Sequence, residues 1–250
     1  MAVDTGTFGG VYDLERFTLS DMTRCGIQLR KLGAGASSLE AVAGRTVEFL
    51  YGSLRARDGT PACALIRMFV TMPYEELEPN QQDAVRTVLG AAPEFESMKC
   101  LTLLASAGEL PAWNSRRDSV GHRALPLVSE ESVARSPMIA QLIRQLGIEV
   151  GTFVGRDENL VVDVNQHTFN VFYVPEAIGS AYIPAQDDFV IPYDVRSVLG
   201  FGGLLPSGEL FATILFSKAP IARDTADLFK TLALNVKVAI LPFVGRKVFA

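Results

Sequence analysis

The sequence contains few of the residues that build metal sites and disulfide frameworks. Its 250 residues include 3 cysteines and 2 histidines. Cys25, Cys63 and Cys100 are far apart and flanked by apolar residues, which is typical of reduced, buried thiols. We therefore predict neither a disulfide nor a structural metal.

Long charged runs and long apolar runs are also missing. The chain has 23 basic and 28 acidic residues, a net charge of −5, and neither sign is clustered, which argues against a nucleic-acid partner. No segment approaches the roughly 20 apolar residues of a membrane span, and the start of the chain lacks the pattern of a signal peptide. We expect a cytoplasmic protein that binds neither nucleic acid nor membrane.

What is present is the composition of a large, folded core. Hydrophobic residues make up 48% of the chain and charged residues 20%, and no repeat or linker marks a boundary. We predict one domain over residues 1–250. Its parts are N-terminal helices at 12–56, first strands and a polar loop at 60–128, an insertion or pocket wall at 129–192, and a closing hairpin and helix at 193–241.

The closing part has the clearest local pattern. Residues 195–205 and 210–216 are mostly apolar and flank Pro206-Ser207-Gly208, which predicts a β-hairpin. Apolar residues at helical spacing then predict a helix over 224–241, capped by Asp224 or Thr225 and stopped by Pro242.

Similar patterns predict the remaining elements. Ser37 or Ser38 with Glu40 predicts a capping box at the start of the second helix. The segment 62–70 is apolar apart from Arg67, as expected of a central strand. The segment 175–192 is longer than an ordinary connection, which predicts a packed loop or lid. Helices are expected at 12–33, 37–56, 79–90 and 137–147, and further strands at 99–107, 123–127, 160–164 and 168–174.

These elements fit two fold classes, one better than the other. In a doubly wound parallel sheet, a glycine-rich phosphate loop would follow a strand, whereas residues 200–203 lie inside one. We predict an α+β fold with a central, mostly antiparallel sheet. The N- and C-terminal helices pack on one side of it, and an elaborated pocket side forms the other.

Several segments resemble GAF domains, the small-molecule sensor modules of bacterial signalling proteins. They are LEAVAGRTVEFLYGSLRARDGTPACALIRMFV, MKCLTLLASAG and the closing hairpin with its helix. More specifically, the chain is similar to the N-terminal input region of bacterial two-component histidine kinases, through WNSRRDSVGH, FNVFYVPEAIGSAYIP and SVLGFGGLLPSGELFATILFS. The segment 129–192 exceeds the usual span of the family.

The resemblance implies a ligand-sensing input domain with a downstream kinase or cyclase module. It also implies a homodimer through the terminal helices. Candidate residues for that contact are Phe17, Val236, Ile240 and Phe243, which core packing would explain equally.

The polar loop holds the candidate binding residues. Trp offers a stacking face, Asn paired donors and acceptors, Arg a planar fork for carboxylate or phosphate groups, and His a titratable nitrogen. We predict a site for a small polar ligand; the alternative is that these side chains make only structural contacts. The residues are Trp113, Asn114, Arg116, Arg117 and His122, joined by Tyr173 from the predicted strand 168–174.

Two other chemistries are weaker alternatives. A haem cofactor would need His122 or His167 as its axial ligand, with an apolar, aromatic wall. Ser119, His122 and Asp118 are the three residue types of a hydrolytic Ser-His-Asp triad, but the sequence around them lacks the GxSxG motif of a nucleophile elbow. We therefore expect no enzyme, and keep a small cytoplasmic enzyme or stand-alone scaffold of unknown reaction as the alternative function.

Overall fold

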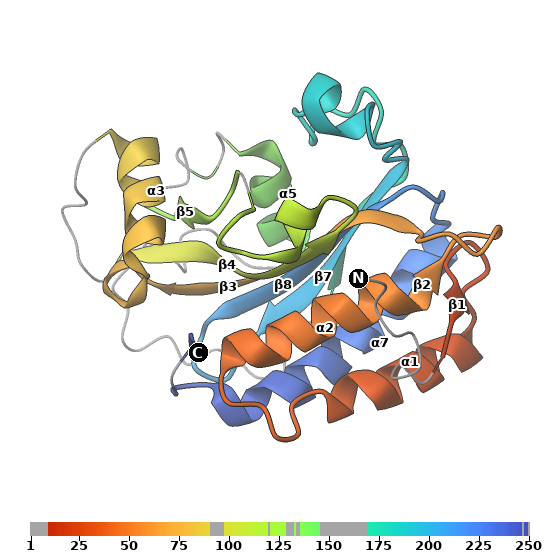
Figure 1. The fold of residues 1–250 in the computed structure, drawn as a ribbon, viewed down its shortest axis with the longest axis horizontal. Coiled ribbons are helices and arrows are strands. Elements are labelled where there is room, and N and C mark those ends of the chain that lie inside the picture. Colours follow the sequence, from red (N-terminus) through yellow and green to blue (C-terminus); the bar gives the residue numbers. More distant parts are fainter. Residues whose placement is uncertain are drawn as a thin grey trace.

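A six-stranded antiparallel sheet forms the centre of the molecule (Figure 1). The computed structural model describes residues 10–90, 98–119, 121–128, 133, 136–145, 170–246 and 248–249. The strand order is β5-β4-β3-β8-β7-β6, and every neighbouring pair is antiparallel. The predicted α+β class is confirmed, and the doubly wound alternative is wrong. The strands are β3 Cys63–Pro73, β4 Lys99–Gly108, β5 Ala124–Pro126, β6 Asn170–Val174, β7 Ser197–Leu204 and β8 Leu210–Ser217.

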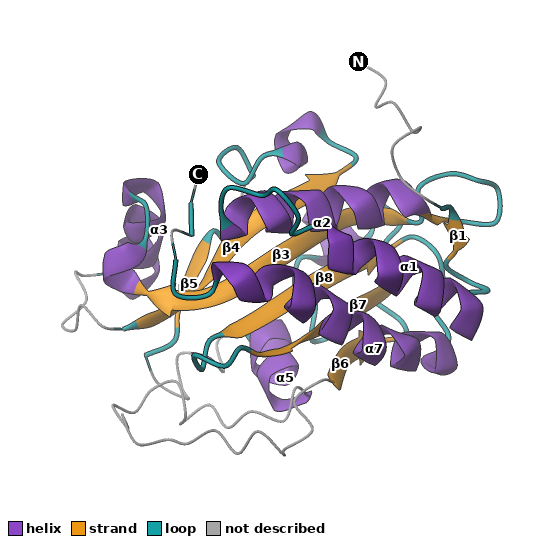
Figure 2. Ribbon diagram, turned by 90° about the horizontal axis from the view of Figure 1, so that it is seen from below, coloured by secondary structure: helices purple, strands orange, loops and turns teal. Residues whose placement is uncertain are grey.

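Three helices from the two ends of the chain cover one face of the sheet, the helix face (Figure 2). They are α1 (Leu19–Lys31), α2 (Leu39–Ser53) and α7 (Arg223–Ile240). On the opposite face, the loop face, α5 (Pro137–Gln145) packs together with the segment 175–195. The helix α3 (Pro79–Leu89) lies beside the edge strand β5. The predicted placement of the terminal helices on one side is confirmed.

The first predicted helix begins later than its apolar spacing suggests. Tyr12–Asp13 forms a short strand, β1, that pairs in parallel with β2, Leu54–Arg55. The helix α1 starts only after Thr18, whose side chain accepts a hydrogen bond from the Asp21 amide in a full capping box. This cap fixes the start of the helix.

The caps of the other two long helices also correct the sequence reading. Ser38 caps α2 by accepting a hydrogen bond from the Ala41 amide at 3.1 Å. Glu40 does not close a capping box, because with Ser38 as the N-cap it is the second residue of α2 and not the third; its carboxylate forms an ion pair with Arg116. The helix α7 begins after Ala222 without a side-chain cap, so the prediction that Asp224 or Thr225 caps it is wrong. Asp224 lies in the first turn instead, where a negative charge suits the helix dipole.

Glycines allow α1 and the loop after it to approach α7 closely. A Cβ on Gly26 would lie 2.6 Å from the Asn235 Nδ2 atom, and one on Gly33 would lie 2.3 Å from the Ala239 carbonyl oxygen. No real side chain fits so close to a backbone atom. The approach of this loop to α7 therefore depends on Gly33, whereas a Cβ at Gly26 would meet the side chain of Asn235.

Alternation along β3 divides the core into two layers. Ile66 and Met68 belong to the large apolar cluster on the helix face, whereas Leu65 and Phe69 belong to the cluster on the loop face. Arg67 stands between Leu65 and Phe69 in this alternation, so its side chain points to the loop face. This register places a guanidinium beside the apolar residues of the loop face.

The segment 175–195 is packed against the loop face (cyan in Figure 1). Residues Gln186–Val190 form a π-helical turn. The Gln186 side chain accepts a hydrogen bond from the Gly179 amide and donates to the Ala177 and Ile183 carbonyls. The predicted strand at 160–164 and the end of the predicted 137–147 helix lie outside the described residues. Of the helices that are described, none is both long and apolar enough to cross a membrane.

Candidate functional site

A buried arginine is the most unusual feature of the loop face. The residue Arg67 is 7% exposed, and its Nη2 atom donates a hydrogen bond to the Ser119 hydroxyl at 2.6 Å. Its Nη1 atom lies 3.4 Å from the Gly121 carbonyl oxygen. Burial lowers the pKa of Arg67 to about 10, so the guanidinium still carries its charge at neutral pH.

Two further polar side chains adjoin this guanidinium. Ser106 is paired with Arg67 across β3 and β4, is 6% exposed, and its hydroxyl has no hydrogen-bond partner within the described parts of the chain. His122 follows Gly121 in the loop. Although this residue reaches solvent, the burial of its ring and the charge of Arg67 lower its pKa, which favours a neutral imidazole at pH 7. We call Arg67, Ser106, Ser119 and His122 the Arg67 cluster.

The backbone over the Arg67 cluster takes a rare conformation. Gly121 has a φ of 76° and His122 a φ of 44°, and such positive values suit glycine far better than histidine. Strain of this kind is typical of functional loops. Both residues are exposed, so the loop is also the point at which the Arg67 cluster meets solvent.

Arg116, a predicted ligand-binding residue, makes structural contacts. Its side chain is 4% exposed, and it forms ion pairs of 2.5 Å with Glu40 and 2.6 Å with Glu78. The ring of Phe249 lies over it, with its centroid 4.5 Å from the guanidinium carbon. We call these four residues the Arg116 clamp. The neighbouring Arg117 is exposed and lies 3.4 Å from Glu78.

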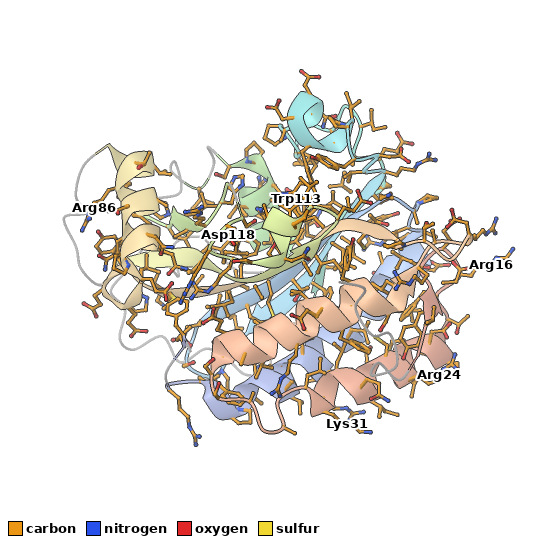
Figure 3. All side chains as sticks on the ribbon, in the orientation of Figure 1. Arg16, Arg24, Lys31, Arg86, Trp113 and Asp118 are labelled. Carbon is orange, nitrogen blue, oxygen red and sulfur yellow. The ribbon has the colours of Figure 1, made fainter. Side chains whose placement is uncertain are left out.

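Trp113 and Asn114 fix the turn that follows β4. The Asn114 side chain accepts a hydrogen bond from the Gly108 amide at 2.9 Å and donates to the Leu110 carbonyl at 3.2 Å. The Trp113 ring packs on Phe189 and Tyr193 of the segment 175–195, with centroid distances of 5.6 and 4.6 Å. Figure 3 shows Trp113 below that segment and Asp118 closer to α3.

Tyr173 lies apart from the other predicted residues. Its ring packs against the core of the helix face, its hydroxyl donates to the Ile221 carbonyl, and Arg223 lies 5.7 Å above the ring. The sheet separates it from the loop face. The six predicted residues therefore do not line one site, and His122 alone belongs to the Arg67 cluster. Sequence reasoning did not include Ser106 or Arg67 among the candidate residues, although Arg67 was visible as the one charge in an apolar strand.

The surroundings of His122 do not favour the haem alternative. His122 adjoins a guanidinium on an exposed loop, not the apolar wall that haem requires. His167 lies outside the described residues. Within the described part of the chain, no group of three or more His, Cys, Asp or Glu residues could hold a metal ion.

The three cysteines are buried free thiols on the helix-face side of the sheet. Burial raises the pKa of Cys25, Cys63 and Cys100 to about 12 in each case. Thiols of this kind are weak nucleophiles at neutral pH. The Ser119 hydroxyl accepts a hydrogen bond from Arg67. The described contacts therefore do not pair this hydroxyl with His122 as a nucleophile and its base.

Comparison with known proteins gives a likeness of fold. No family model and no curated protein sequence matches the chain. Among solved structures, it is similar to the free methionine-R-sulfoxide reductase from Neisseria meningitidis in complex with its substrate. The TM-score is 0.46, 9% of residues are identical, and the match covers 90% of each chain. At this identity the likeness concerns the fold and transfers neither reaction nor substrate.

The same comparison corrects one expectation. From the absence of catalytic motifs we expected no enzyme, and that deduction is wrong, because the similar solved structure is that of a reductase. A missing motif in this sequence therefore does not exclude catalysis.

Proposed function

We propose that this chain is a small-molecule-binding input domain whose ligand carries a carboxylate or phosphate group and binds at the Arg67 cluster. The observation that carries the proposal is the position of Arg67, a buried guanidinium that points from the central strand into the loop face. Guanidinium groups match carboxylates and phosphates in both charge and shape.

A ligand would bind by replacing the loop oxygen atoms that now contact Arg67. Ser119 and Gly121 offer this guanidinium neutral oxygen atoms as acceptors. An anionic group that replaced them would form an ion pair with the guanidinium and could accept two parallel hydrogen bonds from it, which the neutral oxygens do not offer. The Ser106 hydroxyl is placed to donate to the same anion, and His122 is placed to contact the rest of the ligand.

A thermal-shift screen tests this proposal, with Trp113 fluorescence as a second readout. The probes are the common amino acids, short mono- and dicarboxylates, and inorganic phosphate. A binding probe at about one hundred times its Kd should stabilise the chain by roughly 2.7 kcal/mol. Arg67→Met should abolish the effect, and Ser106→Ala should lower the affinity for the probe about tenfold, the loss expected of one hydrogen bond to a charged group.

Arg117→Ala is the matched control, because it removes an exposed arginine from the same loop region. Circular dichroism verifies that each variant is folded. The proposal fails if no probe stabilises the wild type, or if folded Arg67→Met responds as the wild type does.

The signalling role follows from the resemblance to histidine-kinase input regions. Ligand binding would alter the packing of α1 and α7, and a downstream kinase or cyclase module would read that change. A ligand produces such an output only if it binds one arrangement more tightly than the other.

A homodimer would need exposed apolar residues on the terminal helices. Three of the candidates, Phe17, Val236 and Ile240, are at most 4% exposed and belong to the core, so they do not form that contact. Phe243 is half-buried against the same core. Exposed apolar residues do occur on these helices, and we propose them as the dimer contact: Ile27, Leu234 and Val238, which are 41%, 47% and 42% exposed.

A further inference from the structure

The residues near the C-terminus are docked on the start of α2. The Val248 carbonyl accepts a hydrogen bond from the Glu40 amide at 2.9 Å. Glu40 is in the first turn of α2, where an amide has no carbonyl of its own helix to bind. The next residue, Phe249, lies over the Arg116 guanidinium. We call residues 248–249 the tail; Figure 1 shows the C-terminus beside this end of α2.

The Arg116 clamp holds three other parts of the chain around this tail. Arg116 comes from the loop before β5, Glu40 from α2, and Glu78 from the residue that precedes α3. Burial alone would lower the pKa of Arg116, but the hydrogen bonds to Glu78 and Glu40 outweigh it and raise that pKa. Its Nη2 atom is buried with no hydrogen-bond partner in the described structure. The clamp thus retains an unpaired donor, which makes the docked arrangement less stable than a fully bonded one.

One short turn connects the clamp to the Arg67 cluster. The Ser119 amide donates to the Ser115 carbonyl at 2.9 Å, which closes a turn over residues 115–119. Arg116 leaves this turn toward Glu40 and Glu78, and Ser119 leaves it toward Arg67. Because both contacts arise from the same closed turn, a displacement of Ser119 from Arg67 also displaces the base of the Arg116 side chain.

We propose that the turn 115–119 couples the Arg67 cluster to the docking of the tail. A ligand that displaces Ser119 from Arg67 weakens the Arg116 clamp and releases the tail, and by reciprocity a docked tail opposes that ligand. The role of the ligand rests on the proposed function. The coupling itself belongs to the contacts of this chain and can be measured without a ligand.

Hydrogen exchange of the Glu40 amide in the full chain, followed by NMR, measures the docking directly. The Ala41 amide is the internal control, since it lies in the same turn but binds the Ser38 hydroxyl. Phe249→Ala and Arg116→Ala should each increase the exchange rate of the Glu40 amide about tenfold and leave that of Ala41 within about twofold. Arg86→Ala, which removes an exposed arginine that pairs with Asp83 on α3, should change neither rate.

Ser119→Ala tests the coupling, because it removes the hydroxyl that binds Arg67 and touches no residue of the clamp. It should increase the Glu40 exchange rate at least about threefold, whereas Ser207→Ala, an exposed hydroxyl in the β7–β8 turn, should not. If Phe249→Ala leaves the Glu40 rate unchanged, the docked tail is wrong. If Phe249→Ala raises it and Ser119→Ala does not, the coupling is wrong.

The outcome is distinct from that of the ligand screen. A positive Ser119→Ala result together with a failed screen would preserve the coupling and overturn the proposed ligand. A successful screen with unchanged exchange would do the reverse.

Discussion

At the scale of single residues, Arg67 combines a cost in stability with the anion binding that we propose for it. Taking a guanidinium out of water is unfavourable, and the contacts of Arg67, among them those with the Ser119 hydroxyl and the Gly121 carbonyl, offset this cost. A residue kept for stability alone would be apolar at this position of β3, like Leu65 and Phe69 on the same face.

This reasoning predicts the effect of Arg67→Met on stability. The substitution replaces a buried charge by an apolar side chain of similar length, so the free energy of unfolding should stay equal or rise by about 1 kcal/mol. Urea unfolding at pH 7 measures it. A loss of more than about 2 kcal/mol would show that Arg67 is a structural residue.

Glycine at position 202 gives a second prediction at this scale. A Cβ at Gly202 would lie 2.1 Å from the Phe211 carbonyl oxygen of the neighbouring strand. Gly202→Ala should therefore destabilise the fold by about 2–3 kcal/mol, because backbone must move. Thermal unfolding provides the measurement.

Gly44→Ala is the matched control for that substitution. Gly44 lies within α2 with open space around its Cβ position, so alanine there should stabilise by about 0.5–1 kcal/mol. Equal effects of the two substitutions would contradict the strand packing described for β7 and β8.

At the scale of elements, the parts of the fold that depend on local pattern could be predicted. The hairpin of β7 and β8, the central strand β3 and the helices α2, α3 and α7 lie within a few residues of their expected bounds. The strand β1 could not be predicted, because Tyr12 pairs with Leu54, more than forty residues along the chain. A segment of only two residues forms a strand where another segment of the chain pairs with it, and this pairing is not visible in the local sequence.

The same distinction applies to the candidate site. Residue types in the loop 113–122 indicated binding, but neighbours in a loop point in different directions, and Arg116 turned toward α2 while Trp113 turned toward the segment 175–195. Ser106 joins Arg67 only through the register of β3 and β4. That register includes a bulge between Met68 and Phe69, which no spacing rule reveals from one sequence.

The Arg116 clamp gives a pH-dependent prediction at this scale. The hydrogen bond from Arg116 holds the pKa of Glu78 below its usual value of 4.5. A depressed carboxyl pKa contributes stability that is fully present above pH 4.5 and is lost as the pH falls through the lower, folded value.

Glu78→Gln should therefore destabilise the chain by about 1–2 kcal/mol at pH 7, because it leaves Arg116 with one charge partner fewer. It should cost progressively less below pH 4.5. Urea unfolding at pH 7 and pH 3 measures both. Asp83→Asn, which alters an exposed ion pair of α3, is the control and should be close to neutral at both values. A cost for Glu78→Gln that did not diminish in acid would contradict the ion pair.

At the scale of the whole molecule, the two faces of the sheet have separate roles in this account. The loop face holds the Arg67 cluster, and the helix face carries α1 and α7, whose exposed apolar residues are proposed to pair two copies. The turn 115–119 and the tail are proposed to connect the loop face to the start of α2.

The proposed pairing of the helices predicts the behaviour of Leu234→Glu. This residue is 47% exposed, so a charge there should leave the fold intact and prevent association. Sedimentation velocity should show a dimer for the wild type and a monomer for the variant. Val88→Glu on α3, 58% exposed and away from the terminal helices, should remain dimeric. A wild type that is monomeric at all concentrations would refute the contact.

The central claim is that an anionic ligand binds the guanidinium of Arg67. The most direct measurement is an NMR titration of the arginine side-chain N–H signals with the best-stabilising carboxylate or phosphate of the screen, assigned with Arg67→Met. The account predicts that the Arg67 signals shift in proportion to occupancy while those of Arg117 and Arg45 do not move. A stabilising compound that shifted the signals of other arginines and left those of Arg67 unchanged would contradict it.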